Sequence, residues 1–218
     1  MPKDDSEALA CTPKPLAAHG FNQKAVIPYG CTVKHLRRAM QDFLDFLGFT
    51  NTQLYTKQIP RLEAFLMPAN FSSMVGEFII AAIPKYCPTV VKNAYHNGHP
   101  DLLPKGIFAK DSMLHADKGI EIKSSRYRKA WQGHNAEECF LMVVVFDSSR
   151  PTDVTNNIAP KPFSFVKVVG AQLTKADWKF AGRSATSRRT ITASVTDAGC
   201  AKMEVNWMYR APDSVSRS

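Results

Sequence analysis

The sequence has few cysteines, and none of them are paired. The chain of 218 residues has an odd number of cysteines, which are scattered and never at the C-x-x-C spacing. They are Cys11, Cys31, Cys87, Cys139 and Cys200. This pattern argues against a disulfide scaffold and a zinc ribbon, which both need cysteines at regular, paired spacings. We therefore expect ordinary thiols in a reducing cytoplasm.

Long apolar runs are also missing. The longest run, Phe140 to Phe146, is far shorter than the roughly 20 residues that span a bilayer. The opening residues, Met1-Pro2-Lys3-Asp4-Asp5, contain no apolar segment of the kind that a secretory signal has. We expect a soluble, intracellular protein with no membrane partner.

Acidic side chains are in the minority. There are 19 Asp and Glu against 28 Lys and Arg, which gives a formal net charge of +9 and a sequence pI near 9.4. An anionic partner is the first expectation, and nucleic acid fits better than a membrane because no basic amphipathic helix stands out. The alternative is a mildly basic protein that binds no anion at all.

One stretch in the middle of the chain alternates in a way that is typical of a strand. Ile120 and Ile122 alternate with Glu121 and Lys123, so the isoleucines lie on one face and the charged pair on the other. Asp101 stands just ahead of the apolar pair Leu102-Leu103 and offers a second carboxylate on an adjacent segment. Such a set is suited to holding a hard divalent cation over a phosphate.

Pro100-Asp101 with Glu121-Ile122-Lys123 resembles the motif of the PD-(D/E)XK nuclease superfamily, which includes many type II restriction endonucleases. Similar short patterns occur at Asp177-Trp178-Lys179 and at Pro212-Asp213. Asp177 follows Thr174 at capping-box spacing and more simply starts a short helix, and Pro212-Asp213 lies in a polar tail. Only the first set combines strand alternation, order and spacing.

The resemblance implies a Mg²⁺ site and roles for its residues. Asp101 and Glu121 would hold the ion together with the main-chain carbonyl of Ile122, and Lys123 would orient the attacking water or offset charge developing on phosphorus. Glu77, the only charge in an apolar helix, stands where the superfamily often contributes another glutamate. The alternatives are a structural salt bridge for Glu77 and a solvated ion pair for Glu121 and Lys123.

The resemblance also implies an α/β (α+β) fold with a central mixed sheet flanked by helices. With 44% hydrophobic residues, the chain can build a sizeable core. We expect an irregular N-terminal arm at 1–30 and a single nuclease domain at 31–218, with a catalytic core at about 70–147 and a C-terminal part at 163–210. The periodicity predicts helices at 33–47, 61–67, 71–83 and within 125–138. It predicts strands at 90–94, in the segment that starts at Asp101, and at 118–124, 140–146, 163–173, 190–195 and 203–209.

Basic residues follow the proposed catalytic strand and recur near the C-terminus. Arg126, Arg128 and Lys129 are placed to bind DNA phosphates, and a basic loop with Arg183, Arg188 and Arg189 could contact phosphates or read bases. A flexible, solvated loop is the plain alternative. The histidines His96, His99, His115 and His134 lack the partners of a zinc finger, so we interpret them as structural, although Gln132 or His134 could reach the site.

These patterns together predict a Mg²⁺-dependent type II restriction endonuclease that hydrolyses double-stranded DNA at a specific short sequence. It would act as a homodimer, without an organic cofactor, in the cytoplasm of a prokaryotic cell. The alternatives are a repair, recombination or mobile-element nuclease on the same core, and a nucleic-acid-binding module without catalysis.

Overall fold

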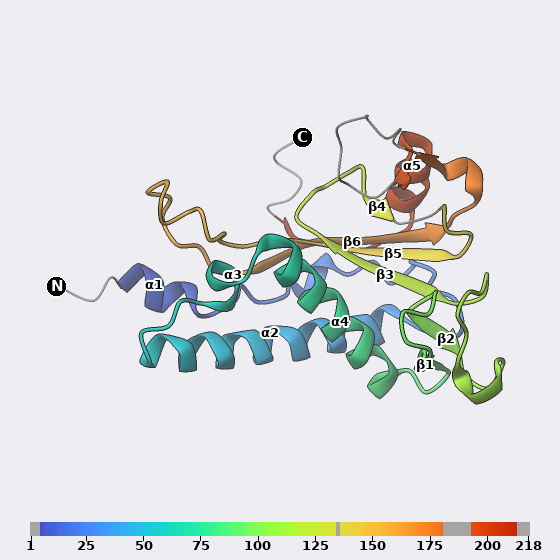
Figure 1. Ribbon diagram of the computed structural model, residues 1–218, viewed down its shortest axis with the longest axis horizontal. Coiled ribbons are helices and arrows are strands. Elements are labelled where there is room, and N and C mark those ends of the chain that lie inside the picture. The colour runs from blue at the N-terminus through green and yellow to red at the C-terminus, as the bar shows by residue number, and fades with distance from the viewer. Residues whose placement is uncertain (1–4, 134–135, 181–192, 213–218) are drawn as a thin grey trace.

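The computed structural model describes residues 5–133, 136–180 and 193–212 and is built on one mixed sheet (Figure 1). The strand order is β1-β2-β3-β5-β6-β9. These strands are β1 (Val90–Lys92), β2 (Leu102–Pro104), β3 (Ile120–Ser125), β5 (Phe140–Asp147), β6 (Ser164–Gln172) and β9 (Trp207–Arg210). β3 and β5 run parallel, and the other neighbouring pairs are antiparallel. The predicted central mixed sheet flanked by helices is therefore confirmed.

Two long helices, α2 (Val33–Thr56) and α4 (Pro68–Tyr86), lie along one face of the sheet (Figure 1). Their buried apolar side chains pack with Ile120 and Ile122 of β3 in the main core. α2 begins as predicted, with the side chain of Thr32 accepting the His35 N–H, but the predicted end at Gly48 is wrong. A Cβ at Gly48 would lie 3.1 Å from the Pro13 ring, so this glycine admits the N-terminal segment and does not end the helix.

The prolines around α4 also differ from expectation. Pro68 is in the first turn of α4, where its missing N–H has no helical partner to lose. Pro84 lies inside the last turn and does not close the helix before it. The short helix predicted at 61–67 is reduced to α3 (Leu62–Phe65).

The opposite face of the sheet is covered by α5 (Asp197–Val205) and a small sheet with the order β4-β8-β7 (Figure 1). Its strands are β4 (Gln132–Gly133), β8 (Ala193–Val195) and β7 (Trp178–Phe180). The helix predicted within 125–138 is not found in the described part of that range, which is loop and β4. The strand predicted at 203–209 is split between the end of α5 and the start of β9.

The apolar run at β5 joins two cores. Met142 and Val144 pack under α2 and α4, whereas Leu141 and Val143 pack under α5 with Trp131, as the unbroken run predicted for a strand covered on both faces. None of the helices in the described part of the chain has the length and apolarity needed to cross a bilayer.

The N-terminal segment wraps around the domain. It contains α1 (Asp5–Ala10) and the short helix η1 (Ala18–Gly20) and is otherwise irregular. The Lys14 N–H donates to the carbonyl of Phe163 at 2.8 Å, and the Phe21 ring packs on Tyr209 at 4.7 Å. Two further 3-10 turns, η2 (Ala109–Asp111) and η3 (Lys175–Asp177), lie in loops, and η3 starts at Thr174 with the predicted capping box.

A buried ion pair ties the N-terminal segment to the helices. Arg61 is 2% exposed and donates to Glu63 at 2.6 Å and to Glu7 at 2.7 Å. Asn51 of α2 donates to the second oxygen of Glu63 at 3.0 Å, and Ser149 accepts from Arg61 at 3.2 Å. Both oxygens of the fully buried Glu63 are therefore bonded.

Glu63→Ala should destabilise the fold by about 3 kcal/mol or more, because it leaves the buried Arg61 charge without its closest partner. Glu7→Ala is the matched control: Glu7 is about one third exposed, so water can replace it and the loss should be clearly smaller. Urea unfolding of the three proteins measures the difference, and equal losses would contradict this account.

Candidate active site

The structure brings the three predicted catalytic residues together at one end of β3. Glu121 and Lys123 lie on the face of β3 opposite to Ile120 and Ile122, as the alternation predicted. Asp101, just ahead of β2, accepts the Ile122 N–H at 2.8 Å through one carboxylate oxygen. The sheet therefore joins two carboxylates and an ammonium from two adjacent strands.

Glu121 is bonded through both of its oxygens. Oε1 lies 2.7 Å from Nζ of Lys123, and Oε2 lies 2.9 Å from Nδ1 of His99. The side chains of Glu121 and Lys123 are 11% and 19% exposed. The alternative of a solvated surface pair is therefore wrong, because both charges are largely withdrawn from water.

Glu137, which the sequence analysis missed, belongs to the same group. Its Oε1 lies 3.3 Å from Nζ of Lys123, while its Oε2 is buried without a hydrogen-bond partner. Its main-chain carbonyl accepts the indole N–H of Trp178 at 3.0 Å, which anchors the segment ahead of β5. The only sequence signal was an acidic pair, Glu137-Glu138, placed directly before an apolar strand.

His99 is a hydrogen-bonded histidine beside the carboxylates. Its Nε2 lies 3.5 Å from Sγ of Cys139, and its ring stacks on His115 with centroids 5.2 Å apart. One ligand atom each of His99, Glu121 and Glu137 lie within 4.8 Å of one another. These three residues are therefore close enough to share a metal ion.

Burial and mutual charge shift the ionisation of the group. Burial and the charge of Glu121 raise the pKa of Asp101 to about 8, so Asp101 is mostly protonated at neutral pH without a metal. Burial also acts to raise the pKa of Glu121, but the hydrogen bond from His99 and the charge of Lys123 outweigh it, so that the pKa of Glu121 is lowered. Burial raises the pKa of Glu137 as well. The pKa of Lys123 is raised, because Glu121 and Glu137 outweigh the effect of burial.

The donor set fits the Mg²⁺ site that the resemblance implies. Asp101 and Glu121 are two adjacent carboxylates that cannot both ionise cheaply without a cation, as the raised pKa of Asp101 records. In an extended strand the N–H and C=O of one residue point to the same side, so the Ile122 carbonyl faces the side on which its N–H meets Asp101. Oxygen donors of this kind are the ligands that Mg²⁺ prefers.

Glu77 is not part of the group, and its predicted metal role is wrong. Its side chain is 63% exposed and pairs with Lys92 at 2.7 Å. The neighbouring Gly76 is the residue that faces β3, since a Cβ there would lie 3.3 Å from Oγ of Ser124. One residue further along a helix turns about 100° away, which directs Glu77 away from this contact and toward Lys92. Glu77 instead forms the salt bridge that was considered as its alternative role.

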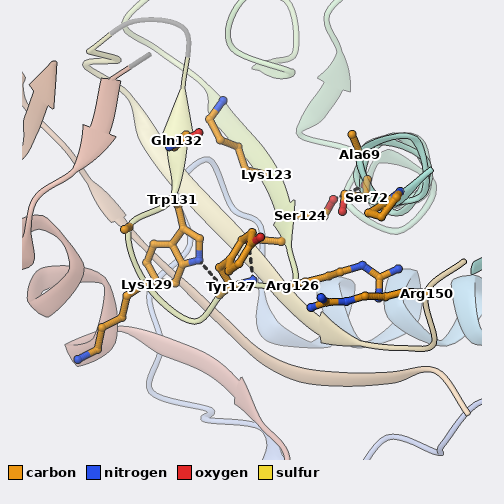
Figure 2. A pocket seen from close by; sticks show the side chains of 13 residues that line it. Ala69, Ser72, Lys123, Ser124, Arg126, Tyr127, Lys129, Trp131, Gln132 and Arg150 are labelled. Atoms are coloured by element: carbon orange, nitrogen blue, oxygen red, sulfur yellow. Dashed lines mark hydrogen bonds between the residues drawn. The ribbon is translucent and has the colours of Figure 1, made fainter. Parts of the chain in front are cut away.

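A basic cleft of about 870 Å³ adjoins Lys123 (Figure 2). Four basic residues and no acidic residue are found among the described residues that line it. The basic residues are Lys123, Arg126, Lys129 and Arg150. The first turns of α4 contribute Ala69 and Ser72 to the opposite wall.

The predicted DNA-contacting residues fare differently. Lys129 lines the cleft and is exposed, whereas Arg126 is half-buried, donates to Ser148 and stacks over Phe146. Arg128 is exposed but is not among the lining residues. Arg150, which the sequence analysis missed, also lines the cleft and is exposed. The pKa of Arg126 is lowered, mainly by its own burial and next by the charge of Arg150.

Two other predictions concern the surroundings of the site. Gln132, which was considered as a residue that could reach the site, belongs to β4 and lines the adjoining cleft. Arg183, Arg188, Arg189 and His134 lie outside the described residues.

A separate group of potential ligands, Cys31, His35 and Cys87, lies where the start of α2 meets the end of α4. Burial raises the pKa of Cys31 to about 12, so this thiol keeps its proton at neutral pH. Metal binding by cysteine needs the thiolate. The carboxylate group on β3 is therefore the stronger candidate for a functional site.

Comparison with known proteins adds no relative to this picture. No family model matches the chain, and searches of the curated proteins and of the solved structures found no match.

Asp101→Asn should stabilise the metal-free protein increasingly as the pH rises. The raised pKa of Asp101 means that the folded chain holds a proton which the unfolded chain releases, so stability falls with pH between the ordinary carboxyl pKa and about 8. Asparagine cannot ionise, so the gain over wild type should be roughly 1–3 kcal/mol larger at about pH 8.5 than at about pH 5. Urea unfolding in EDTA measures it. Asp117→Asn, at an exposed position, is the control, and parallel pH profiles for all three proteins would contradict a buried, protonated Asp101.

Proposed function

We propose that this protein is a Mg²⁺-dependent endodeoxyribonuclease of the PD-(D/E)XK type that hydrolyses phosphodiester bonds in double-stranded DNA. The observation that carries the proposal is the position of Asp101, Glu121 and Lys123: three ionisable side chains, largely withdrawn from water, that adjoin a basic cleft through Lys123. Clusters of perturbed pKa values beside a cleft are typical of catalytic sites.

The order of elements supports the same proposal. A helix, α4, precedes three antiparallel strands, β1, β2 and β3, and β5 then adds in parallel beside β3. This agrees with the superfamily core that the sequence resembles, a mixed sheet flanked by helices. The connection from β3 to β5 departs from the expectation, because its described part contains loop and β4 where a helix was predicted.

The residues of the chain divide the chemistry among them. Asp101 and Glu121, with the Ile122 carbonyl, would hold Mg²⁺, which when bound supplies a Lewis acid for the phosphate and a lowered pKa for its water. Asp101 must first lose its proton, so ion binding should be coupled to proton release near neutral pH. Lys123 keeps its ammonium charged beside the carboxylates and can orient the attacking water or offset charge on the phosphoryl oxygens.

The cleft provides the means to hold the substrate. Lys129 and Arg150 offer exposed cations to DNA phosphates, and the half-buried Arg126 adds a further positive charge to the lining. The N-terminal turn of α4 adds the positive end of a helix dipole to the same wall. A phosphate bound here would lie beside Lys123, where the reaction is proposed to take place.

The finer proposal is a type II restriction endonuclease that cuts at a specific short sequence. Each chain carries one candidate site, so cutting both strands in one binding event would need two copies, arranged as a homodimer on a symmetric sequence. Cleavage of plasmid DNA into discrete fragments supports this finer proposal. Preference for nicked, flapped or mismatched DNA would replace it with a repair or recombination nuclease on the same core.

Glu121→Ala and Lys123→Ala should each abolish DNA cleavage, with a loss of at least about 100-fold, because each removes a group that acts on the reacting phosphate. The measurement is plasmid and phage DNA cleavage with Mg²⁺ or with EDTA. Glu77→Gln, at an exposed position whose side chain pairs with Lys92, should cleave like wild type. Absence of cleavage by the wild-type protein with any divalent ion would leave a nucleic-acid-binding module as the better account.

Lys129→Ala and Arg150→Ala should each weaken DNA binding in EDTA several-fold, regardless of sequence. Each should also reduce the slope of log affinity against log salt by about one, as expected for the loss of one phosphate contact. Lys57→Ala, an exposed lysine that does not line the cleft, is the matched control. Fluorescence anisotropy at several salt concentrations measures both quantities, and an unchanged slope in both cleft variants would remove the cleft from the DNA-binding surface.

A further inference from the structure

Three possible metal ligands meet from three separate segments of the chain. His99 comes from the loop before β2, Glu121 from β3 and Glu137 from the segment before β5. Their ligand atoms lie within 4.8 Å of one another, and Nδ1 of His99 is 2.9 Å from Oε2 of Glu121. Asp101 is not a member of this group of three, and one of its oxygens accepts the N–H of Ile122.

One atom of this group has an unmet requirement. Oε2 of Glu137 is buried without a hydrogen-bond partner, and the side chain is only 7% exposed. A buried carboxylate oxygen without a donor costs free energy, and a coordinated cation removes that cost. Lys123 does not meet the requirement, because it is near the other oxygen of Glu137 and is shared with Glu121.

The imidazole is held in place for coordination. The His99 ring stacks on His115 at an interplanar angle of 21°, and its Nε2 faces Sγ of Cys139 at 3.5 Å. A cation bound here would displace the proton that Nδ1 donates to Glu121, and Nε2 would keep the other ring proton toward this sulfur, as the outer hydrogen bond of a metal-bound histidine usually ensures. Trp178 fixes the Glu137 segment from the other side.

We propose that His99, Glu121 and Glu137 form a second cation position that takes a divalent transition-metal ion, such as Mn²⁺, in preference to Mg²⁺. A nitrogen ligand is the basis of that preference, since Mg²⁺ binds oxygen almost exclusively whereas first-row transition metals accept imidazole. The proposal rests on the proposed function only in that Glu121 also serves the Mg²⁺ position. It differs from that position in using neither Asp101 nor the Ile122 carbonyl.

The test measures Mn²⁺ binding to the full chain in the absence of DNA. Calorimetry gives the affinity, and pulsed electron paramagnetic resonance identifies the ligands of the bound ion. The wild-type spectrum should show nitrogen modulation from one coordinated imidazole. His99→Ala should remove the modulation, and Glu137→Gln should weaken Mn²⁺ binding by about 10-fold or more. His96→Ala, an exposed neighbouring histidine, and Glu138→Gln, the adjacent and more exposed glutamate, should leave both signals unchanged.

Bound Mn²⁺ without nitrogen modulation in the wild-type protein would overturn the proposal, as would modulation that persists in His99→Ala. Failure to bind Mn²⁺ would overturn it too, and these results on the unaltered chain do not depend on whether a variant folds. The nuclease proposal is tested separately, by cleavage with Mg²⁺. Cleavage without nitrogen modulation would support the nuclease proposal and overturn the second cation position. Nitrogen modulation without cleavage would support the second cation position and overturn the nuclease proposal.

Discussion

The parallel pairing of β3 with β5 is the constraint on which the rest of the structure depends. Parallel neighbours need a connection that crosses one face of the sheet, and here that connection begins after Ser125 and returns at Phe140. Because both strands start at the same edge, Ile120 lies beside Phe140, and the residues just ahead of β5 arrive beside the first residues of β3. From there the segment ahead of Phe140 is folded back along β3, because Glu137 meets Lys123, whose register partner is Val143. The same pairing places β5 between two cores, so the site is built on the most buried part of the sheet.

Two buried charge networks in this protein differ in a way that separates structure from function. Around Arg61, both oxygens of Glu63 are bonded, and the group joins helices and loops. Around Lys123, one oxygen of Glu137 has no partner, and burial and the neighbouring Glu121 keep Asp101 protonated at neutral pH. An incomplete network of this kind lowers stability, and such sites occur where a ligand completes them.

The sequence predicted the parts of the site that depend on local periodicity. The alternation of 120–123 was enough to place Glu121 and Lys123 on one face, and the apolar run at β5 was enough to predict a strand covered on both sides. Glu137 could not be predicted, because its position depends on contacts with Lys123 and with Trp178, which are distant in the sequence. Glu77 was misplaced for a related reason: helical periodicity gives the spacing of side chains but not which face meets the sheet, and Gly76 faces it. Two helix ends were predicted wrongly. Gly48 lies within α2 because it makes room for Pro13, and Pro84 lies within α4 because it is in the last turn of that helix.

Charge links the cation positions to the cleft. Lys123, the ionised Asp101 and the two ionised glutamates near it carry a formal charge of about −2, and ions at both proposed positions would bring this to about +2 in a largely buried place. The described lining of the adjoining cleft supplies no carboxylate to offset that excess, but a DNA phosphate bound there would. Cation and DNA should therefore bind with positive coupling, and by linkage each raises the affinity for the other. In such an arrangement the cation is held most firmly when the phosphate is in place beside Lys123, so the charged groups reach balance only in the complex that is proposed to react.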